Sequence, residues 1–371
     1  MNQKVNKKIR VGILFGGKSA EHEVSLQSAK NIVEAIDKDK YEVVLIGIDK
    51  NGQWYLNEAS RFLLHAENPK LIALNKSSEH VALVPKDSDN QLVNLSSHQS
   101  LGPIDVVFPI LHGPYGEDGT VQGLLKLFNI PFVGAGVLGS AVGMDKDVMK
   151  RLLRDAGLPV PKFLVFHNES MDEIDFEQVK KQLGLPFFLK PANLGSSVGI
   201  HKVKDESQFK PAIMDAFQYD TKILIEEFIK GREIECSVLG NENPIASIPG
   251  EIIPQHEFYS YEAKYIDEKG ALLKIPAKLS SDITKQIQDI ALRAYKVLCC
   301  EGMARVDFLL RDDKEIFVSE INTIPGFTKI SMYPKLWEAS GIPYKELIDR
   351  LLQLALERFE REKKLKISYD L

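Results

Sequence analysis

Two carboxylates in the C-terminal third of the chain have the spacing to share one face of a β-hairpin. The alternating pattern predicts two strands and a polar connecting turn, at residues 305–310, 316–322 and 311–315. The midpoint between Asp307 and Glu320 falls inside that turn, so the two residues are expected to face each other across the strands. The two-residue side-chain period places Arg305 and Asn322 on the same face. Two acids, a guanidinium and an amide therefore gather on one small patch.

A hard cation would remove the repulsion between two carboxylates that face each other across a hairpin. Mg²⁺ binds carboxylate and carbonyl oxygens together with the phosphates of a substrate. A solvated hairpin face held by salt bridges is the alternative. Apolar neighbours favour burial instead, namely Phe308, Leu309, Phe317 and Val318. The pattern favours a site for a metal ion and a phosphate.

A lysine followed by a loop of small residues is a second candidate for phosphate binding. Lys190 ends the apolar run 186–190, and the loop 193–199 contains only small or uncharged residues. Backbone N–H groups and hydroxyls of such a loop can contact phosphate oxygens. The pattern is not a P-loop, which needs Gly-Lys-Ser/Thr at the start of a helix. A flexible surface loop is the open alternative.

Glycine-rich turns follow two apolar strands near the N-terminus, at residues 16–23 and 111–119. Ligands of open α/β sheets bind at such strand ends. Glu21 and Glu23 could cap the following helix or hold an ammonium group of a substrate. A third turn, Gly134–Gly139, matches G-x-G-x-x-G. It lacks an acidic residue at the end of a following strand, so a dinucleotide site is disfavoured.

Apolar runs at 9–15, 41–48 and 104–111 read as strands, and a helical pattern lies between the first two. This order predicts a parallel α/β sheet. Residues 134–143 read as a turn-rich stretch. Helices are predicted at 145–156 and 344–364, and further strands at 162–166, 186–190 and 222–227. The predicted fold is α/β with three units, comprising residues 1–140 with an elaboration at 52–101, residues 141–229 and residues 230–371.

Composition excludes several classes of protein. The net charge of −5 disfavours a nucleic-acid binder, which would normally present a basic face. No stretch approaches the ~20 apolar residues of a membrane span. The three cysteines, two of them adjacent, suit free thiols of a cytoplasmic protein better than disulfides or zinc ligands.

Taken together, the segments resemble the ATP-grasp superfamily, and within it the D-alanine–D-alanine ligases. The matching stretches occur in the family's order and span most of the chain: 16–26, 111–123, 144–146, 190–199, 225–235, 258–265, 305–308 and 320–334. The family fold has three α/β domains, with ATP between the second and third. One departure is Ser319, where many relatives have Asn; its side chain is expected to point away from the metal face.

The resemblance implies a nucleotide site of Lys146, Lys190, Ser197, Glu226, Glu227, Phe228, Ile229, Glu233 and Lys264. Lys146, Lys190 and Lys264 would contact phosphates, whereas Glu226 and its neighbours would line the adenine pocket. It further implies two Mg²⁺ (or Mn²⁺) ions on Asp307, Glu320 and Asn322, which agrees with the hairpin argument.

The catalytic residues implied by the resemblance are Glu21, His112, Ser196, Tyr265, Arg305, Gly326 and Ser331. Glu21 would hold the ammonium of the first D-alanine, and Ser331 the carboxylate of the second, with His112 beside it. Arg305 and the Gly326 N–H would stabilise an oxyanion. Glu21, Ser196 and Tyr265 would form a hydrogen-bonded link between domains, with Tyr265 on a closing loop at about 255–270.

Two molecules of D-alanine, ATP and a second copy of the chain are the implied partners. A ligase that joins D-alanine to D-lactate (or D-serine) is the close alternative, and Tyr265 within Ala-Lys-Tyr favours the dipeptide enzyme. Another ATP-grasp ligase or a non-catalytic nucleotide-binding regulator is more distant. A regulator would be expected to have lost a phosphate lysine or a metal ligand, and none is missing.

Overall fold

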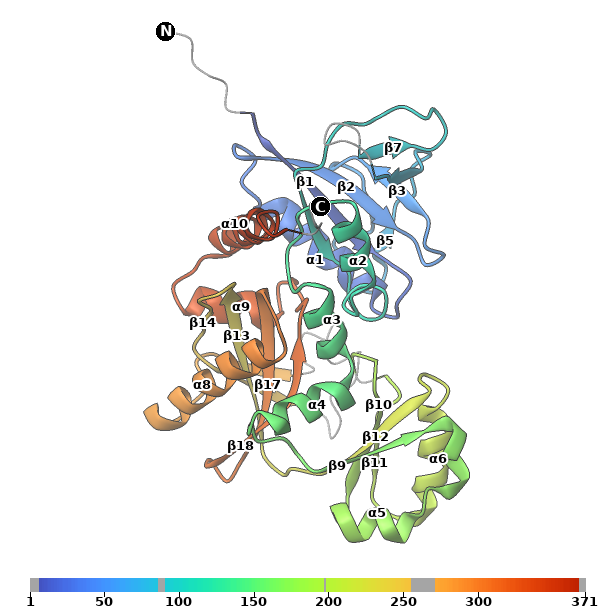
Figure 1. Ribbon diagram of the computed structural model, residues 1–371, viewed down its shortest axis with the longest axis vertical. Coiled ribbons are helices and arrows are strands. Elements are labelled where there is room, and N and C mark those ends of the chain that lie inside the picture. Colours follow the sequence, from blue (N-terminus) through green and yellow to red (C-terminus); the bar gives the residue numbers. More distant parts are fainter. Residues whose placement is uncertain (1–6, 86–90, 197, 255–270, 367–371) are drawn as a thin grey trace.

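The computed structural model describes residues 7–85, 91–196, 198–254 and 271–366. Within these ranges, three main sheets and two short ribbons form the β structure. The sheets belong to three units that follow one another along the long axis of the molecule (Figure 1). The prediction of an α/β fold with three units is confirmed.

The N-terminal sheet has the strand order β3-β2-β1-β8. Strands β1 (Ile9–Gly16), β2 (Tyr41–Ile48) and β8 (Val106–Ile110) are parallel, as the buried apolar runs predict. Helix α1 (His22–Ala35) connects the first two strands. The predicted elaboration adds an antiparallel edge strand and two ribbons, β3 (Trp54–Asn57), β4 (Leu63–Leu64) with β5 (Ala73–Leu74), and β6 (Val81–Leu83) with β7 (Leu92–Asn94).

The central sheet is antiparallel, with the order β11-β10-β12-β9. Its strands are β9 (Phe163–His167), β10 (Phe187–Pro191), β11 (His201–Val203) and β12 (Lys222–Glu227). The 3₁₀ helix η1 (Asn168–Glu173) follows β9. Helices α5 (Phe176–Leu183) and α6 (Glu206–Ala216) share a core with residues of one sheet face, including Leu189 and Ile225. The two-residue period then puts Lys190 and Glu226 together on the opposite face.

The C-terminal sheet has the order β16-β15-β13-β17-β18, with β14 beside β13. Its strands are β13 (Arg232–Gly240), β14 (Ile245–Ala246), β15 (Gly250–Pro254), β16 (Ala271–Lys274), β17 (Gly302–Arg311) and β18 (Glu315–Asn322). Helix α8 (Ser281–Val297) covers one face. Helix α4 (Lys146–Asp155), which the predicted boundary assigns to the central unit, packs Met149 and Leu153 into the same core.

The turn-rich stretch predicted at 134–143 is mostly helix, so that prediction is wrong. Helix α3 spans Val137–Met144. A Cβ on Gly139 would lie 2.5 Å from the carbonyl oxygen of Cys299, and one on Gly143 would lie 2.9 Å from the Thr323 side chain. These glycines let the helix approach the third unit closely. Close packing therefore accounts for the glycines of this segment, and no dinucleotide site is needed to explain them.

The last helix returns to the first unit. Helix α10 (Tyr344–Glu362), close to its predicted range, shares a core with β1 and β8 through Leu347, Leu351 and Leu352. Arg358 is buried there and donates to the carbonyl of Phe132 at 2.7 Å. The remaining helices of the described ranges are α2 (Thr120–Leu127) and α9 (Met332–Ala339). The N-terminal unit is therefore completed by the C-terminal end of the described chain.

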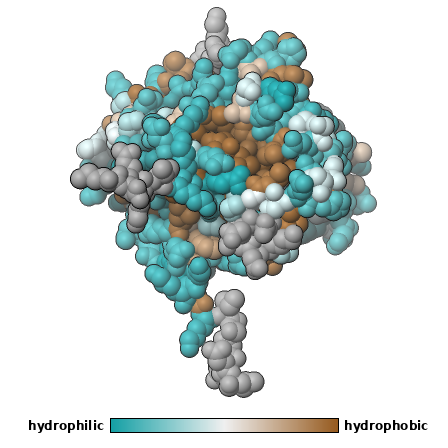
Figure 2. All heavy atoms as spheres, turned by 90° about the horizontal axis from the view of Figure 1, so that it is seen from above, coloured by the Kyte–Doolittle hydropathy of each residue, from teal (hydrophilic) through white to brown (hydrophobic). Residues whose placement is uncertain are grey.

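Cys236, Cys299 and Cys300 are free thiols, as predicted. Among the helices of the described ranges, none is long and apolar enough to cross a membrane. Seen from the side of the N-terminal unit, apolar side chains gather in the middle of the face, with polar ones around them (Figure 2).

Candidate active site

The carboxylate hairpin forms with the predicted pairing. Asp307 is paired with Glu320 and Arg305 with Asn322 in the β17–β18 register. The hairpin is not simple, however, because the next pair is Phe308 with Val318. Ser319 is the extra residue of a β-bulge. If the Phe308–Val318 register continued without a bulge, Asp307 would be paired with Ser319. The bulge thus decides which side chain stands opposite Asp307.

Basic groups offset the repulsion between the acids on this face. Arg305 binds both oxygens of Asp307, at 2.7 Å through Nε and 2.8 Å through Nη2. Its Nε also lies 2.9 Å from Glu235 Oε2, and Asn322 Nδ2 donates to Asp307 at 3.0 Å. Glu235 pairs with Asp307 across β13 and β17, so a row of three carboxylates crosses the sheet through Glu320.

The predicted metal ligands supply two carboxylates and one amide. Within the described ranges, no three His, Cys, Asp or Glu side chains are grouped as a metal site. Hard cations readily take their other ligands from phosphate and water oxygens. The donor set of Asp307, Glu320 and Asn322 therefore fits Mg²⁺ bound together with a phosphate-bearing substrate.

Glu21 contacts a loop of the central unit instead of capping its own helix. It stands at the N-cap of α1 but makes no side-chain capping bond. Its Oε1 accepts a hydrogen bond from the Ser196 hydroxyl. Cβ atoms added to Gly113 and Gly195 would lie 2.7 and 3.1 Å from Glu21 Oε2, so both glycine-rich loops pack on this carboxylate. Tyr265, the third member of the predicted link, lies outside the described residues.

His112 belongs to a buried hydrogen-bond chain between the first unit and the segment after β18. Its Nδ1 lies 3.0 Å from the Ile324 carbonyl, which can only accept, so Nδ1 carries the proton. Its Nε2 then accepts from the Ser28 hydroxyl at 3.3 Å, and Ser28 accepts from the Phe327 N–H at 3.2 Å. Burial lowers the pKa of His112 to about 4. The imidazole is therefore neutral at pH 7.

The loop after β18 brings Gly326 and Ser331 together. A Cβ on Gly326 would lie 2.7 Å from Ser331 Oγ, which excludes a larger residue without rearrangement. Ser331 Oγ also accepts from the Thr328 N–H at 3.0 Å. These contacts keep the Gly326 N–H and the Ser331 hydroxyl close to each other.

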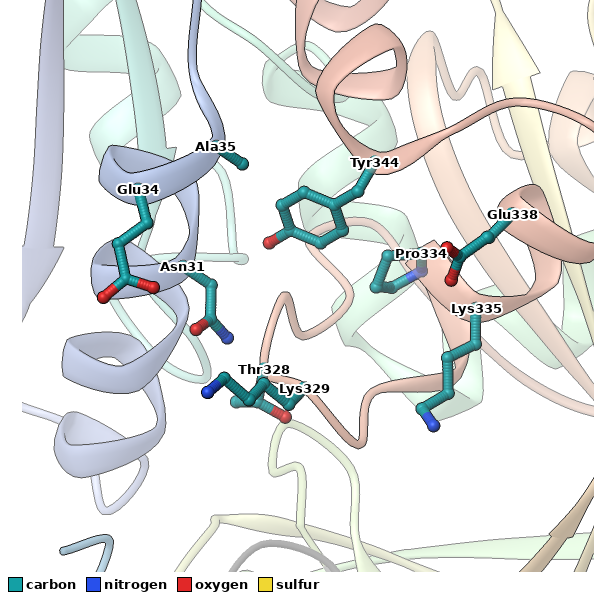
Figure 3. A pocket seen from close by; sticks show the side chains of 9 residues that line it. All are labelled: Asn31, Glu34, Ala35, Thr328, Lys329, Pro334, Lys335, Glu338 and Tyr344. Carbon is teal, nitrogen blue, oxygen red and sulfur yellow. The ribbon is translucent and has the colours of Figure 1, made fainter. Parts of the chain in front are cut away.

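A cavity of about 340 Å³ lies outside this loop, between α1, α9 and α10 (Figure 3). Asn31 and Tyr344 in its wall both donate to the Phe327 carbonyl at 2.9 Å. The cavity is not lined by Lys190, Glu226 or the carboxylate hairpin, so its wall supports the loop without belonging to the polar site.

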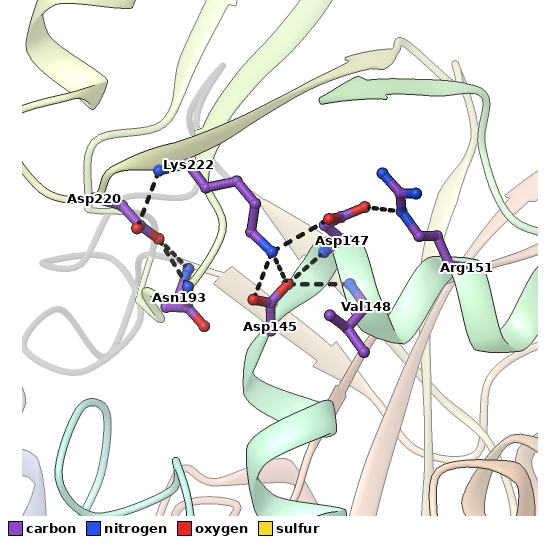
Figure 4. Close-up of polar contacts among 7 residues, drawn as sticks. All are labelled: Asp145, Asp147, Val148, Arg151, Asn193, Asp220 and Lys222. Carbon is purple, nitrogen blue, oxygen red and sulfur yellow. Dashed lines mark hydrogen bonds and ion pairs between the residues drawn. The ribbon is translucent and has the colours of Figure 1, made fainter. Parts of the chain in front are cut away.

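The loop after Lys190 is anchored by polar contacts that the sequence did not reveal. Asp220 accepts from the backbone and the side chain of Asn193 at 2.8 and 3.0 Å (Figure 4). Lys222 binds Asp145 at 2.7 Å and Asp147 at 3.2 Å, at the start of α4. The only sequence signal was Asp145 at the start of a predicted helix. Ser197, within this loop, lies outside the described residues.

Lys146 connects the loop to the carboxylate hairpin. Its N–H donates to the Ala192 carbonyl at 3.0 Å and its ammonium donates to the Leu194 carbonyl. The same ammonium lies 4.0 Å from Glu320. A phosphate bound between the central and C-terminal units would therefore meet Lys146.

Glu226 is buried between two lysines. Lys150 Nζ lies 2.6 Å from its Oε1, and Lys190 contacts its Oε2. Burial raises the pKa of Glu226, but the two ammonium groups outweigh it and hold that pKa below its ordinary value. Sequence reasoning missed Lys150, although it follows Lys146 by one helical turn.

The other predicted nucleotide residues follow Glu226 on or near the connection from β12 to β13. Glu227 accepts from the Lys162 N–H at 2.7 Å. The Phe228 ring lies 5.9 Å from that of Phe188, Ile229 is buried, and Glu233 is in β13. Lys264 lies outside the described residues.

The chain combines an antiparallel sheet that carries a small-residue loop with a second antiparallel sheet that carries a carboxylate hairpin, and its fold is that of the ATP-grasp class of enzymes. The chain belongs to the D-alanine–D-alanine ligase family within that class. A family model described as D-ala D-ala ligase N-terminus matches residues 10–135. A second, described as D-ala D-ala ligase C-terminus, matches residues 152–353.

Relatives and solved structures of this family are similar to the chain over almost its whole length. A D-alanine–D-alanine ligase of Oceanobacillus iheyensis is 62% identical over 361 residues, covering 97% of this chain and 99% of the relative. The D-alanine–D-alanine ligase structure from Coxiella burnetii is 41% identical with a TM-score of 0.84, covering 96% of each chain. The VanG D-Ala:D-Ser ligase structure from Enterococcus faecalis is 35% identical with a TM-score of 0.82, covering 94% of this chain and all of that one.

The buried His112 predicts a specific pH dependence of stability. Its folded pKa of about 4 lies below the ordinary value of 6.5, so the unfolded chain binds the proton more tightly. The stability from neutral His112 is therefore present above pH 6.5 and is lost as the pH falls towards 4, by about 3 kcal/mol in full. NMR should show no titration of this imidazole between pH 7 and 5. His112→Gln should remove this part of the pH dependence of unfolding, and an imidazole titrating near pH 6.5 would contradict the prediction.

Proposed function

We propose that this chain uses ATP to join two molecules of D-alanine into D-alanyl-D-alanine, a precursor of peptidoglycan. The observation that carries the proposal is the position of Lys146. Its ammonium donates to the loop after Lys190 and lies 4.0 Å from Glu320 of the carboxylate hairpin. A single cation thus stands where a phosphate group and its metal ions would meet.

The reaction has two steps. The carboxylate of the first D-alanine, held at its ammonium by Glu21, attacks the γ-phosphate of ATP to give an acyl phosphate and ADP. Lys146 and Lys190 neutralise phosphate charge during this transfer. Asp307, Glu320 and Asn322 would hold Mg²⁺ (or Mn²⁺), which supplies further neutralisation when bound.

The second D-alanine is held at its carboxylate by Ser331. Its neutral amine attacks the acyl carbon, and the phosphate group leaves to give the dipeptide. Arg305 and the Gly326 N–H stabilise the tetrahedral oxyanion, and one such donor typically contributes ~3 kcal/mol. His112 and Ser28 hold the segment that carries Gly326, because they bind Ile324 and Phe327.

A ligase with another acceptor is the second candidate, because a D-Ala:D-Ser ligase shares this fold. The deciding assay measures ATP-dependent phosphate release and identifies the product by mass. D-alanine alone should give D-alanyl-D-alanine, whereas L-alanine should give no product. Addition of D-lactate or D-serine should not divert the product. Turnover that ignores D-alanine would overturn the assignment, and a mixed product would favour the second candidate.

The carboxylate hairpin offers a direct test of the metal assignment. Asp307→Ala or Glu320→Ala should lower turnover by about a thousandfold or more, because phosphate charge is no longer neutralised. The chain should stay folded by circular dichroism. Glu315→Ala is the matched control, since Glu315 is an exposed acid of the same hairpin, paired with Arg311. Near-normal activity of either site variant would contradict the assignment.

We also propose that the chain works in the cytoplasm as a homodimer formed through its N-terminal unit. A largely apolar cavity of about 620 Å³ is lined there by residues such as Trp54, Leu124 and Leu127. Leu127 and Tyr115, which both line this cavity, are 78% and 56% exposed. Exposed apolar patches of this kind mark protein interfaces. A second copy of the chain would cover them.

Leu127→Asp should convert the dimer to a monomer, because it places a charge in the apolar contact. Sedimentation velocity at micromolar concentration measures the change. Met214→Asp on α6 is the control, since Met214 is also exposed but lies in the central unit. A wild-type monomer, or a dimer unaffected by Leu127→Asp, would refute this interface.

A further inference from the structure

Lys150 is a fully buried lysine for which the proposed reaction has no use. Its side chain has no exposed surface, so it cannot reach solvent. The ammonium lies 2.6 Å from Glu226 Oε1 and donates to the Ser319 carbonyl at 2.9 Å. Because Ser319 is the bulge residue before Glu320, Lys150 contacts both the central sheet and the carboxylate hairpin.

The buried cluster holds more positive than negative charge. Glu226 contributes one negative charge, and Lys150 and Lys190 contribute one positive charge each. A buried carboxylate left with a single lysine would hold that lysine strongly, because separating the pair leaves two unpaired buried charges. With two lysines, one can leave and Glu226 is still paired.

The two lysines differ in their freedom to move. Lys150 belongs to the buried face of α4, and its ammonium is held by the Ser319 carbonyl. The side chain of Lys190 is 13% exposed and stands directly before the small-residue loop. Lys146 has other partners, because its ammonium donates to the Leu194 carbonyl and lies 4.0 Å from Glu320. Lys190 is therefore the lysine that can leave Glu226.

We propose that Lys150 is the permanent counter-ion of Glu226 and so releases Lys190 to bind the phosphates of ATP. Lys150 is a positioning residue, because it acts through Lys190 and does not touch the nucleotide. The proposal rests on the nucleotide site given under the proposed function. Without Lys150, Lys190 would stay paired with Glu226 and the phosphates would lose a cation.

Lys150→Met should weaken the binding of ATP about tenfold or more while changing the binding of adenosine less than threefold. Calorimetric titration and competition give the two dissociation constants. A purely structural role would weaken both ligands equally, because the adenine pocket itself would be disturbed. Equal losses for ATP and adenosine would therefore overturn the proposal. Lys180→Met is the control, since Lys180 forms an exposed pair with Glu177.

A second comparison does not depend on the folding of Lys150→Met. In Glu226→Gln the carboxylate charge is gone, whereas an acceptor oxygen for the adenine remains. The double variant Lys150→Met/Glu226→Gln should then have the same KM for ATP as Glu226→Gln alone. A KM ten times higher in the double variant would refute the role of Lys150.

Lys190→Met separates this inference from the proposed function. An increased KM for ATP in Lys190→Met, together with the loss in Lys150→Met, supports both. An increase in Lys190→Met with normal ATP binding in Lys150→Met overturns only the role of Lys150. A normal KM in Lys190→Met overturns the nucleotide site and this inference with it.

Discussion

The position of helix α4 is the constraint on which the nucleotide side of the site depends. Asp145 at its start binds Lys222 of the central sheet, and Met149 packs in the core of the C-terminal sheet. The helix is thus held by a buried apolar face and by charged contacts at one end. Lys146 and Lys150 both project from it. A shift of α4 would therefore move the phosphate lysine and the buried counter-ion together.

The carboxylate hairpin depends on cations that offset the repulsion between its acids. Glu235, Asp307 and Glu320 form a row across three strands, an arrangement that is unfavourable without cations. Arg305 occupies the space between the first two acids, and Lys146 lies near the third. Arg305 is also the proposed oxyanion donor. The guanidinium that is proposed to bind the oxyanion is therefore also the group that offsets the repulsion between Glu235 and Asp307.

Sequence patterns predicted the features that depend on neighbours along the chain. Two alternating strands and one short turn placed Asp307 opposite the segment that contains Ser319 and Glu320. The bulge at Ser319 could not be predicted, because the turn length alone permits either register. Lys150 was missed because its partners, Glu226 and Ser319, are far away in the sequence. Helix α3 was missed because its glycines suggested turns, whereas they allow close packing on Cys299.

The amino-acid side of the site depends on contacts between sequence-distant units. Ser196 of the central unit binds Glu21, and Ser28 and His112 of the first unit bind the segment after β18. Glu21 and the segment that carries Gly326 are therefore each held by a unit other than their own. Helix α10 fixes the first and third units in one apolar core, whereas the central unit meets the first through polar loops. Movement of the central unit would thus change the surroundings of Glu21 while leaving His112 and Ser331 in place.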